Sequence, residues 1–186
     1  MIITLIYTGM RRGELCGLKW SDIDFANELM QIDRELLYTP ERGIFEDTTK
    51  TYGSQRVIKI SQLVINSLKE YKKEQTKNRL KSGDSWNDTN YIFTQTNGNP
   101  IHPDTLTWWF KKFIRRNPSL PDISIHSLRH TNATLLIANG VNLTTVSKRL
   151  GHANTSTTTK IYAHAIKTAD EMAANTLDDL LKIKRQ

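Results

Sequence analysis

The spacing of apolar residues predicts a mainly helical chain. Over residues 61–80, leucine, valine and tyrosine share one stripe with lysines opposite, the pattern of an amphipathic helix. This segment and three later ones each begin at a residue type that favours the start of a helix. These residues are Ser61, Pro103, Ser124 and Asn142. Gly140 and Gly151 follow the last two segments, so we expect helices over about 61–80, 103–115, 124–139 and 142–150. Trp109, Phe110 and Phe113 form an apolar stripe that we expect in the core.

The pattern changes between residues 29 and 60. Residues 29–38 and 56–60 alternate between apolar and polar or are rich in β-branched side chains, and proline and glycine residues mark turns between them. This arrangement predicts a small antiparallel sheet, with Lys50 on or beside a β-turn. The predicted fold class is therefore α+β, mainly helical, with the sheet near the N-terminal third.

The length of 186 residues suits one compact domain, so we expect residues 1–186 to form a single unit with a tail helix over 170–186. Residues 2–7 are apolar without a preceding helix cap, and we expect the chain to be part of a longer protein. No apolar run approaches the roughly 20 residues of a membrane span. Cys16 is the single cysteine and allows no internal disulfide. We expect a soluble, cytoplasmic protein.

Positive charge is concentrated in one part of the chain. The formal net charge is +7, yet residues 1–104 carry 14 basic and 14 acidic side chains. Residues 105–169 carry nine basic side chains and one acidic one. This segregation is expected of a protein that binds a polyanion, because each neutralised phosphate releases condensed counterions. A merely solvated basic face fits the charge equally well, whereas a membrane fits less well because the stretch lacks a large amphipathic helix.

Residues suited to chemistry gather in the same basic part. Four of the five histidines lie between residues 126 and 164. His126, Arg129 and His130 project from one helix face because they are three and four residues apart. Arginines, a lysine, histidines and a tyrosine without a carboxylate cluster suit phosphoryl transfer on a diester. Guanidinium groups bind the non-bridging oxygens, on which negative charge develops.

Each residue type has a role in that chemistry. Arg11 and Arg129 would hold the phosphate. Tyr162 would attack it, and since a tyrosine has a pKa of about 10, it needs a base such as His126 or strong positive charge nearby. Lys50, on its turn, would give a proton to the departing alkoxide. Any one histidine would more often be a structural residue, so the hypothesis depends on the whole set.

Five short segments follow one another in a distinctive order. They are Thr8-Gly9-Met10-Arg11-Arg12-Gly13-Glu14-Leu15; Lys50 before Ser54-Gln55-Arg56-Val57-Ile58; His126-Ser127-Leu128-Arg129-His130-Thr131; Leu150-Gly151-His152; and Tyr162 ten residues later. Each segment alone is weak, but together, over nearly the whole chain, they resemble the catalytic domain of tyrosine recombinases, the phage integrase family. The resemblance implies a phosphate-activating pocket made of Arg11, Lys50, His126, Arg129 and His152.

The resemblance also implies the reaction and the partners. Tyr162 would attack a DNA phosphodiester to leave a 3′-phosphotyrosine link and a free 5′-hydroxyl, in a site-specific recombinase that integrates or excises a mobile element. No cofactor and no metal are implied. The implied partners are double-stranded DNA at attachment sites, further copies of the chain in a homotetramer, and accessory excision or bending proteins. When bound to DNA, the protein would be associated with the nucleoid. Family members carry N-terminal DNA-binding domains absent from residues 1–186, and they dock a terminal helix in cis or onto a neighbouring protomer.

Basic and polar residues near the predicted pocket are candidates for further DNA contacts. They are Arg12, Lys111, Lys112, His130, Lys148 and Arg149.

Three other classes stay open. Residues 128–139 and 143–150, joined at Gly140, resemble a helix-turn-helix regulator, which would need no phosphate-activating pocket. The histidines could bind zinc in a metal hydrolase, although the glutamate of such helix motifs is missing. A type IB topoisomerase shares the phosphotyrosine chemistry, but the motifs around the histidines favour a recombinase.

Overall fold

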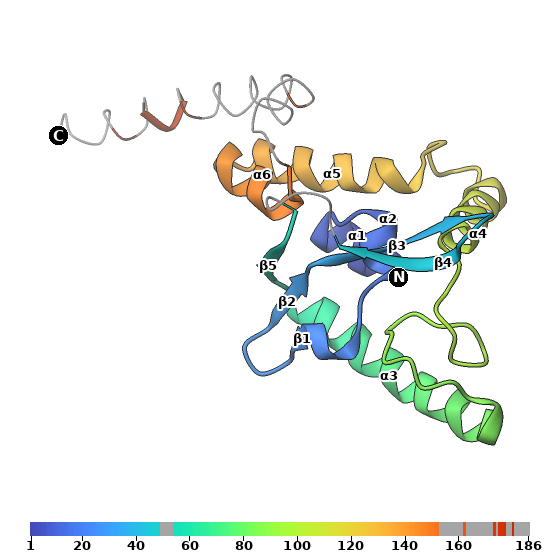
Figure 1. The fold of residues 1–186 in the computed structure, drawn as a ribbon. Helices are drawn as coiled ribbons and strands as arrows, with labels where there is room; N and C mark the ends of the chain where they lie inside the picture. The colour runs from blue at the N-terminus through green and yellow to red at the C-terminus, as the bar shows by residue number, and fades with distance from the viewer. Residues whose placement is uncertain (49–53, 153–161, 163–172, 174, 178–179, 181–186) are drawn as a thin grey trace.

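The computed structural model describes residues 1–48, 54–152, 162, 173, 175–177 and 180 (Figure 1). The helices are α1 (Ile2–Thr8), α2 (Arg12–Cys16), α3 (Gln62–Ser82), α4 (Pro103–Arg116), α5 (Ile125–Ala138) and α6 (Leu143–Leu150). The strands are β1 (Ile23–Asp24), β2 (Leu29–Ile32), β3 (Arg34–Thr39), β4 (Gly43–Thr48) and β5 (Arg56–Lys59). The predicted mainly helical fold with antiparallel β-structure is confirmed. None of the described helices combines the length and apolar character that a membrane crossing requires.

The strands form two small sheets where one was expected. β1, β2 and β5 pair antiparallel in the order β1-β2-β5, with Met30 opposite Ile58. β3 and β4 form a separate hairpin in which Tyr38 lies opposite Ile44. β4 was not predicted, because three of its six residues are glycine or acidic, and these types are depleted in strands.

One main core joins the sheet to the helices. Met30 on β2 and Ile58 on β5 are buried in the same cluster as Val64 and Leu68 of α3. Phe93 is buried there too, in a segment that joins its neighbours through isolated β-bridges. Burial of apolar surface, at about 25 cal/mol per Å², is the main term that stabilises such a cluster.

The predicted helix ends agree with the structure in the central part of the chain. Ser124 and Asn142 each accept a hydrogen bond from a backbone N–H of the first turn, at 3.3 and 2.8 Å. Gly140 and Gly151 lie just beyond α5 and α6 with positive φ angles of 77° and 69°. The tail helix expected over 170–186 falls mostly outside the described residues, and those that are described there are helical.

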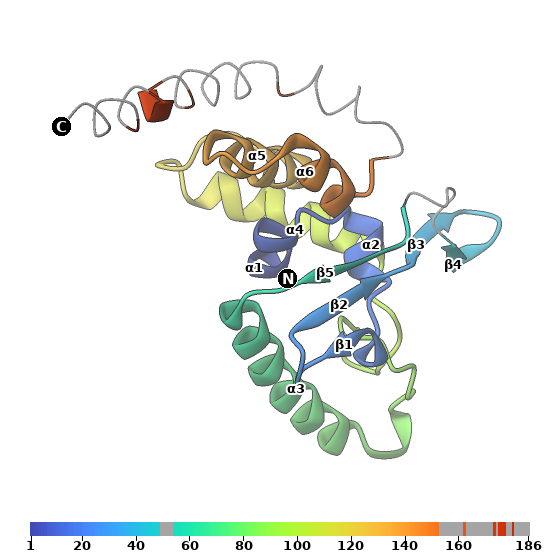
Figure 2. The ribbon, with the colours of Figure 1, turned by 90° about the vertical axis from the view of Figure 1, so that its left-hand side faces the viewer.

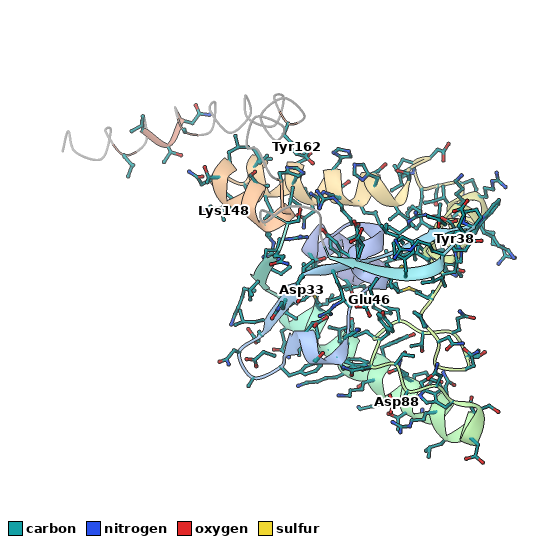
Figure 3. The ribbon with its side chains drawn as sticks, viewed as in Figure 1. Asp33, Tyr38, Glu46, Asp88, Lys148 and Tyr162 are labelled. Carbon is teal, nitrogen blue, oxygen red and sulfur yellow. The ribbon has the colours of Figure 1, made fainter. Side chains whose placement is uncertain are left out.

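α5 and α6 form a helical pair on the side of the molecule opposite α3, with α1 packed against α5 (Figures 1 and 2). The pair encloses a second small core of Ala133, Ile137, Val146 and Leu150. The ring of Tyr162 completes this core, with 5% of its surface exposed. Figure 3 shows Tyr162 beside α5 and α6. The packing of these two helices therefore fixes the position of the tyrosine.

The aromatic stripe of α4 is buried at one residue and exposed at two. Phe110 lies in the core with Leu106 and Ile114, the residues four positions away on either side. Trp109 and Phe113 are 50% and 38% exposed, and their rings stack with centroids 5.5 Å apart. The expectation that all three aromatic residues are core was wrong for these two, because α4 packs through a narrow stripe and they lie at its edge.

Candidate active site

The candidate site is built around the C-terminal end of α6. Gly151 adopts the left-handed conformation, so its N–H and that of His152 bond back to the carbonyls of Lys148 and Ser147. These two bonds end the helix and direct the chain into His152. The carbonyls of residues 149–151 lie at the negative end of the helix dipole, where cations are favoured.

Three arginines from three other elements each bind one of these carbonyls. Arg56 of β5 donates to the carbonyl of residue 149 through Nε at 2.7 Å. Arg129 of α5 donates to that of residue 150 through Nη2 at 2.7 Å. Arg11, directly before α2, donates to that of residue 151 through Nη2 at 3.2 Å. The end of α6 thereby gathers the guanidinium groups next to His152.

Glu14 holds two of these arginines in place. Its side chain is fully buried, and Oε1 accepts from Arg11 Nη1 at 2.8 Å while Oε2 accepts from Arg56 Nη2 at 2.8 Å. Burial by itself raises the pKa of the Glu14 carboxyl, but hydrogen bonds and charges, first of Arg56 and then of Arg11, hold that pKa below its usual value. The carboxylate is therefore charged at neutral pH and offsets part of the positive charge.

Arg11, Arg129 and His126 line one pocket of about 580 Å³, together with residues of β3 and α4 such as Tyr38. Arg129 is only 3% exposed, and its Nη1 also donates to the carbonyl of Gly9 at 2.8 Å. Since a water molecule occupies about 30 Å³ in the liquid, this space is ample for a phosphodiester. The two predicted phosphate-binding arginines therefore do converge on one cavity.

The density of cations controls the protonation of the histidines. Burial, followed by the charges of Arg129 and Arg11, lowers the pKa of His152 to about 4. Burial, followed by the charges of His130 and Arg129, lowers the pKa of His126. Both imidazoles are therefore neutral near pH 7, each with one N–H to donate. Burial lowers the pKa of Arg129 to about 10, which leaves this arginine charged at pH 7.

The hydroxyl of Tyr162 meets a histidine. Tyr162 Oη and His130 Nδ1 lie 3.0 Å apart. The ring of His130 meets that of His126 edge to face, with centroids 4.6 Å apart and planes at 83°. Burial raises the pKa of the Tyr162 phenol, and the charge of Arg129 lowers it in part. Two histidines on one face of α5, spaced as the sequence predicted, thus connect the pocket wall to the tyrosine.

The structure brings five of the six predicted catalytic residues to this region, and they are Arg11, His126, Arg129, His152 and Tyr162. Lys50 lies outside the described residues, and β4 before it ends at Thr48. The catalytic roles of all six stay predictions, because proximity alone does not assign a chemical role.

The predicted DNA contacts fall into two groups. Three of them are exposed on α4 and α6, and these are Lys111, Lys112 and Lys148. The other three are engaged within the protein. Arg12 forms an ion pair with Asp104 at 2.6 Å, Arg149 donates to two backbone carbonyls at 3.0 and 3.1 Å, and His130 contacts Tyr162.

Two residues of the site, Glu14 and Arg56, were not predicted. Glu14 lies in the first turn of a five-residue helix, and Arg56 places a charge at the start of an apolar strand. Charged residues are rarely buried unless they are paired. The signal in the sequence was therefore a charged residue at a position where an apolar one is expected. Their 42-residue separation hides the pair from any local pattern.

A metal site or a reactive thiol would need a particular arrangement of histidine, cysteine and carboxylate side chains. Within the described residues, no group of three or more His, Cys, Asp or Glu side chains is arranged to hold a metal ion. His164, one of the four histidines considered for zinc, lies outside the described residues. Burial raises the pKa of the Cys16 thiol to about 12, so this buried thiol stays protonated at neutral pH.

Solved structures share this fold. A structure of the Tn1549 transposon integrase in complex with transposon right end DNA matches with a TM-score of 0.80 and 26% identity, over 95% of this chain and 57% of that one. A crystal structure of XerA recombinase matches with a TM-score of 0.67 and 25% identity, over 93% and 55% of the two chains. The fold and the site therefore define the class as the catalytic domain of tyrosine recombinases.

The amino-acid sequence gives the family. The family model described as "Phage integrase family" matches residues 1–168, and the chain belongs to this family. The "Tyrosine recombinase XerC-like" protein of Caldanaerobacter subterraneus subsp. tengcongensis is 39% identical over 184 residues, which are 93% of this chain and 47% of that protein. The integrase of Staphylococcus phage L54a is 33% identical over 179 residues, 94% and 49% of the two. The chain spans about half the length of these relatives.

Proposed function

We propose that the protein is a site-specific DNA recombinase, an integrase of a mobile element, that cuts and rejoins strands through a phosphotyrosine at Tyr162. The observation that carries the proposal is the convergence of residues far apart in the sequence. Arg11, Arg129 and His126 line one pocket, and the hydroxyl of Tyr162 contacts the histidine next to His126. Two guanidinium groups at one cavity suit a phosphodiester, because each guanidinium can bind the non-bridging oxygens through two parallel hydrogen bonds.

In the proposed reaction, a DNA phosphate enters this pocket. Arg11 and Arg129 stabilise the negative charge that develops on its non-bridging oxygens, and neutral His126 and His152 add N–H donors. The oxygen of Tyr162 bonds to phosphorus while the bond to the 5′ oxygen breaks. The 5′-hydroxyl of a partner strand later attacks the phosphotyrosine, so the bond energy is conserved without a cofactor.

The departing 5′ oxygen needs a proton, because an alkoxide is a poor leaving group at neutral pH. We assign this proton to Lys50, which follows β4 by two residues. A lysine ammonium suits the role, since its flexible side chain can reach a leaving group.

The proposed substrate is double-stranded DNA carrying attachment sites. The Tn1549 integrase, similar over 95% of this chain, was solved with transposon DNA, which supports this assignment. Exchange between two duplexes requires four strand cuts, so we propose that four copies of the chain act together, with accessory excision or bending proteins. We propose that the activity takes place in the cytoplasm, at the nucleoid, where such DNA would lie.

The test is covalent capture in the full-length protein. In a nicked duplex of the cognate attachment site, cleavage releases a short fragment that carries the free 5′-hydroxyl. Loss of this fragment prevents rejoining, so the tyrosine link persists as a protein–DNA band that survives denaturation. We expect Tyr162→Phe to abolish the band and Arg11→Ala to slow its formation by about 100-fold or more. Arg12→Ala is the matched control, expected to cost less than about tenfold because Asp104 already neutralises Arg12.

Two results would redirect the assignment. Absence of a covalent band from every cognate site would favour the helix-turn-helix regulator. Relaxation of a single supercoiled plasmid, without any exchange between duplexes, would favour the topoisomerase. Equal losses in Arg11→Ala and Arg12→Ala would mean that the wrong arginine of the pair has been assigned.

A further inference from the structure

His130 occupies a position that the proposed function does not use. It lies on α5 and is half-buried, four residues after His126. Its Nδ1 is 3.0 Å from the hydroxyl oxygen of Tyr162, which is hydrogen-bonding distance. Among the residues that the structure describes, no other side chain contacts this hydroxyl at such a distance. The nucleophile of the proposed reaction is therefore paired with an imidazole nitrogen.

The Tyr162 phenol needs a proton acceptor in order to react. Only 5% of the residue is exposed, and burial raises the pKa of its hydroxyl. The charge of Arg129 lowers that pKa only in part, so the phenol is protonated at neutral pH. A phenol that attacks phosphorus must lose its proton as the new bond forms, and a base within hydrogen-bonding distance makes this step easier.

We propose that His130 is a catalytic residue that accepts the proton of Tyr162 as the tyrosine attacks DNA. The inference rests on the proposed function and names the base of that reaction. As Tyr162 Oη bonds to phosphorus, its proton moves to His130 Nδ1. The bond from phosphorus to the 5′ oxygen breaks, and that oxygen takes a proton from Lys50. In the rejoining step the attacking 5′-hydroxyl gives its proton to Lys50, which the first step left neutral, and His130 returns its proton to the departing phenolate.

The groups around His130 are compatible with this transfer. His126 on α5 meets its ring edge to face, and Tyr162 accepts or donates at Nδ1. His152 after α6 lies close enough to interact with His130 by charge. His126 and His152 are neutral near pH 7, so neither brings a positive charge next to His130.

Chemical rescue tests the proposal, using the full-length protein and the nicked attachment-site duplex. His130→Ala should slow phosphotyrosine formation by about 100-fold or more, the range of a general base, and imidazole in the buffer should restore about tenfold. The rescue should increase with pH, because the unprotonated form of imidazole is the active one. His130→Asn should be slow and should gain nothing from imidazole, since its side chain fills the space without taking a proton.

Matched controls separate a chemical role from a structural one. Thr134→Ala changes an exposed residue one turn further along α5 and should cut at the wild-type rate. Tyr162→Phe should give no product with or without imidazole. Melting temperature and DNA affinity report whether each variant is folded and bound.

Three outcomes decide between the explanations. Rescue of His130→Ala alone supports proton transfer to His130. A wild-type rate in His130→Asn overturns the proposal, as does slow cleavage by a folded, DNA-bound His130→Ala that imidazole fails to restore. Where His130→Ala does not fold, slow cleavage by a folded His130→Asn supports the proposal. Failure of the wild-type protein itself to form the tyrosine link would instead overturn the proposed function.

Discussion

Glu14 lies buried between the guanidinium groups of Arg11 and Arg56, and its carboxylate oxygens accept hydrogen bonds from both of them. The charge of Glu14 also acts on Arg129, since it raises the pKa of Arg129 and so offsets part of the lowering caused by burial. At the residue scale, one buried carboxylate therefore allows several cations to share a small volume. Without it, only the backbone carbonyls that these arginines bind would offset their mutual repulsion among the contacts described above.

Replacement of Glu14 by glutamine tests this role. Glu14→Gln leaves two guanidinium groups facing a neutral amide, and we expect the free energy of unfolding to fall by about 3 kcal/mol. Glu70→Gln on α3 is the control, because Glu70 pairs with Lys73 at the exposed surface and should change stability by less than about 0.5 kcal/mol. Urea denaturation at pH 7 measures both, and equal effects would contradict the role given to Glu14.

His152 should make stability depend on pH. Its pKa is lowered from 6.5 to about 4 in the folded protein, so between these values the unfolded chain binds a proton that the folded chain does not. Stability therefore falls as the pH drops from about 6.5 to 4, by at most about 3 kcal/mol from this group. His152→Asn should lack that part of the loss. Urea denaturation from pH 4 to 8 measures the difference, and parallel curves would show that His152 titrates normally.

At the scale of elements, Gly9 joins α1 to the rest of the site. Its φ is 66°, and its carbonyl accepts from Arg129. A β-carbon at this position would lie 2.5 Å from Leu150 Cδ2 and 2.9 Å from Asn132 Oδ1. The end of α1 can therefore approach α5 and α6 only because residue 9 has no side chain.

The matched pair of Gly9→Ala and Gly43→Ala separates two costs. Both glycines have φ of 66°, but a β-carbon on Gly43 would meet nothing within 4 Å. Gly43→Ala should cost about 1–2 kcal/mol of backbone strain, and Gly9→Ala should cost at least about 1 kcal/mol more from overpacking. Denaturant unfolding gives both values. Equal losses would mean that the chain around Gly9 yields without cost.

At the scale of the whole molecule, the helices that carry the positive charge lie toward one side. α4, α5 and α6 lie away from α3 in both views (Figures 1 and 2). Lys111 and Lys112 border a hollow on α4 with the exposed rings of Trp108 and Trp109. Two lysines on α3 are instead paired with acids of the same helix, Lys73 with Glu70 and Lys77 with Glu74. The structure thus keeps the local excess of charge that the sequence showed.

The salt dependence of DNA binding tests this distribution. If Lys111 and Lys112 contact phosphates, the double change to alanine should reduce the slope of log affinity against log salt by about two, the number of released counterions. The same double change at Lys73 and Lys77 removes equal charge from α3 and should leave the slope unchanged. Fluorescence anisotropy over a range of salt concentrations gives both slopes, and similar shifts would indicate a purely global charge effect.

The helix ends and the shared helix face of two histidines were predictable from the sequence for local reasons. Ser124, Asn142 and Gly151 act on backbone groups within a few residues, so their types reveal the boundaries of α5 and α6. His126 and His130 share a face because helical geometry determines which side chains project together. β4 was missed because its pairing with β3, and not its own composition, makes it a strand.

The sequence by itself determined where α5 and α6 begin and end, which face carries the histidines, and that the positive charge is segregated. Only the tertiary structure decided that Arg56 reaches the carbonyl of a residue 93 positions away and that Arg11 reaches one 140 positions away. It also turned Arg149 inward and paired His130 with Tyr162. Periodicity and capping depend on residues a few positions apart and can therefore be recognised in the amino-acid sequence. These contacts, in contrast, exist only once packed helices bring distant segments together.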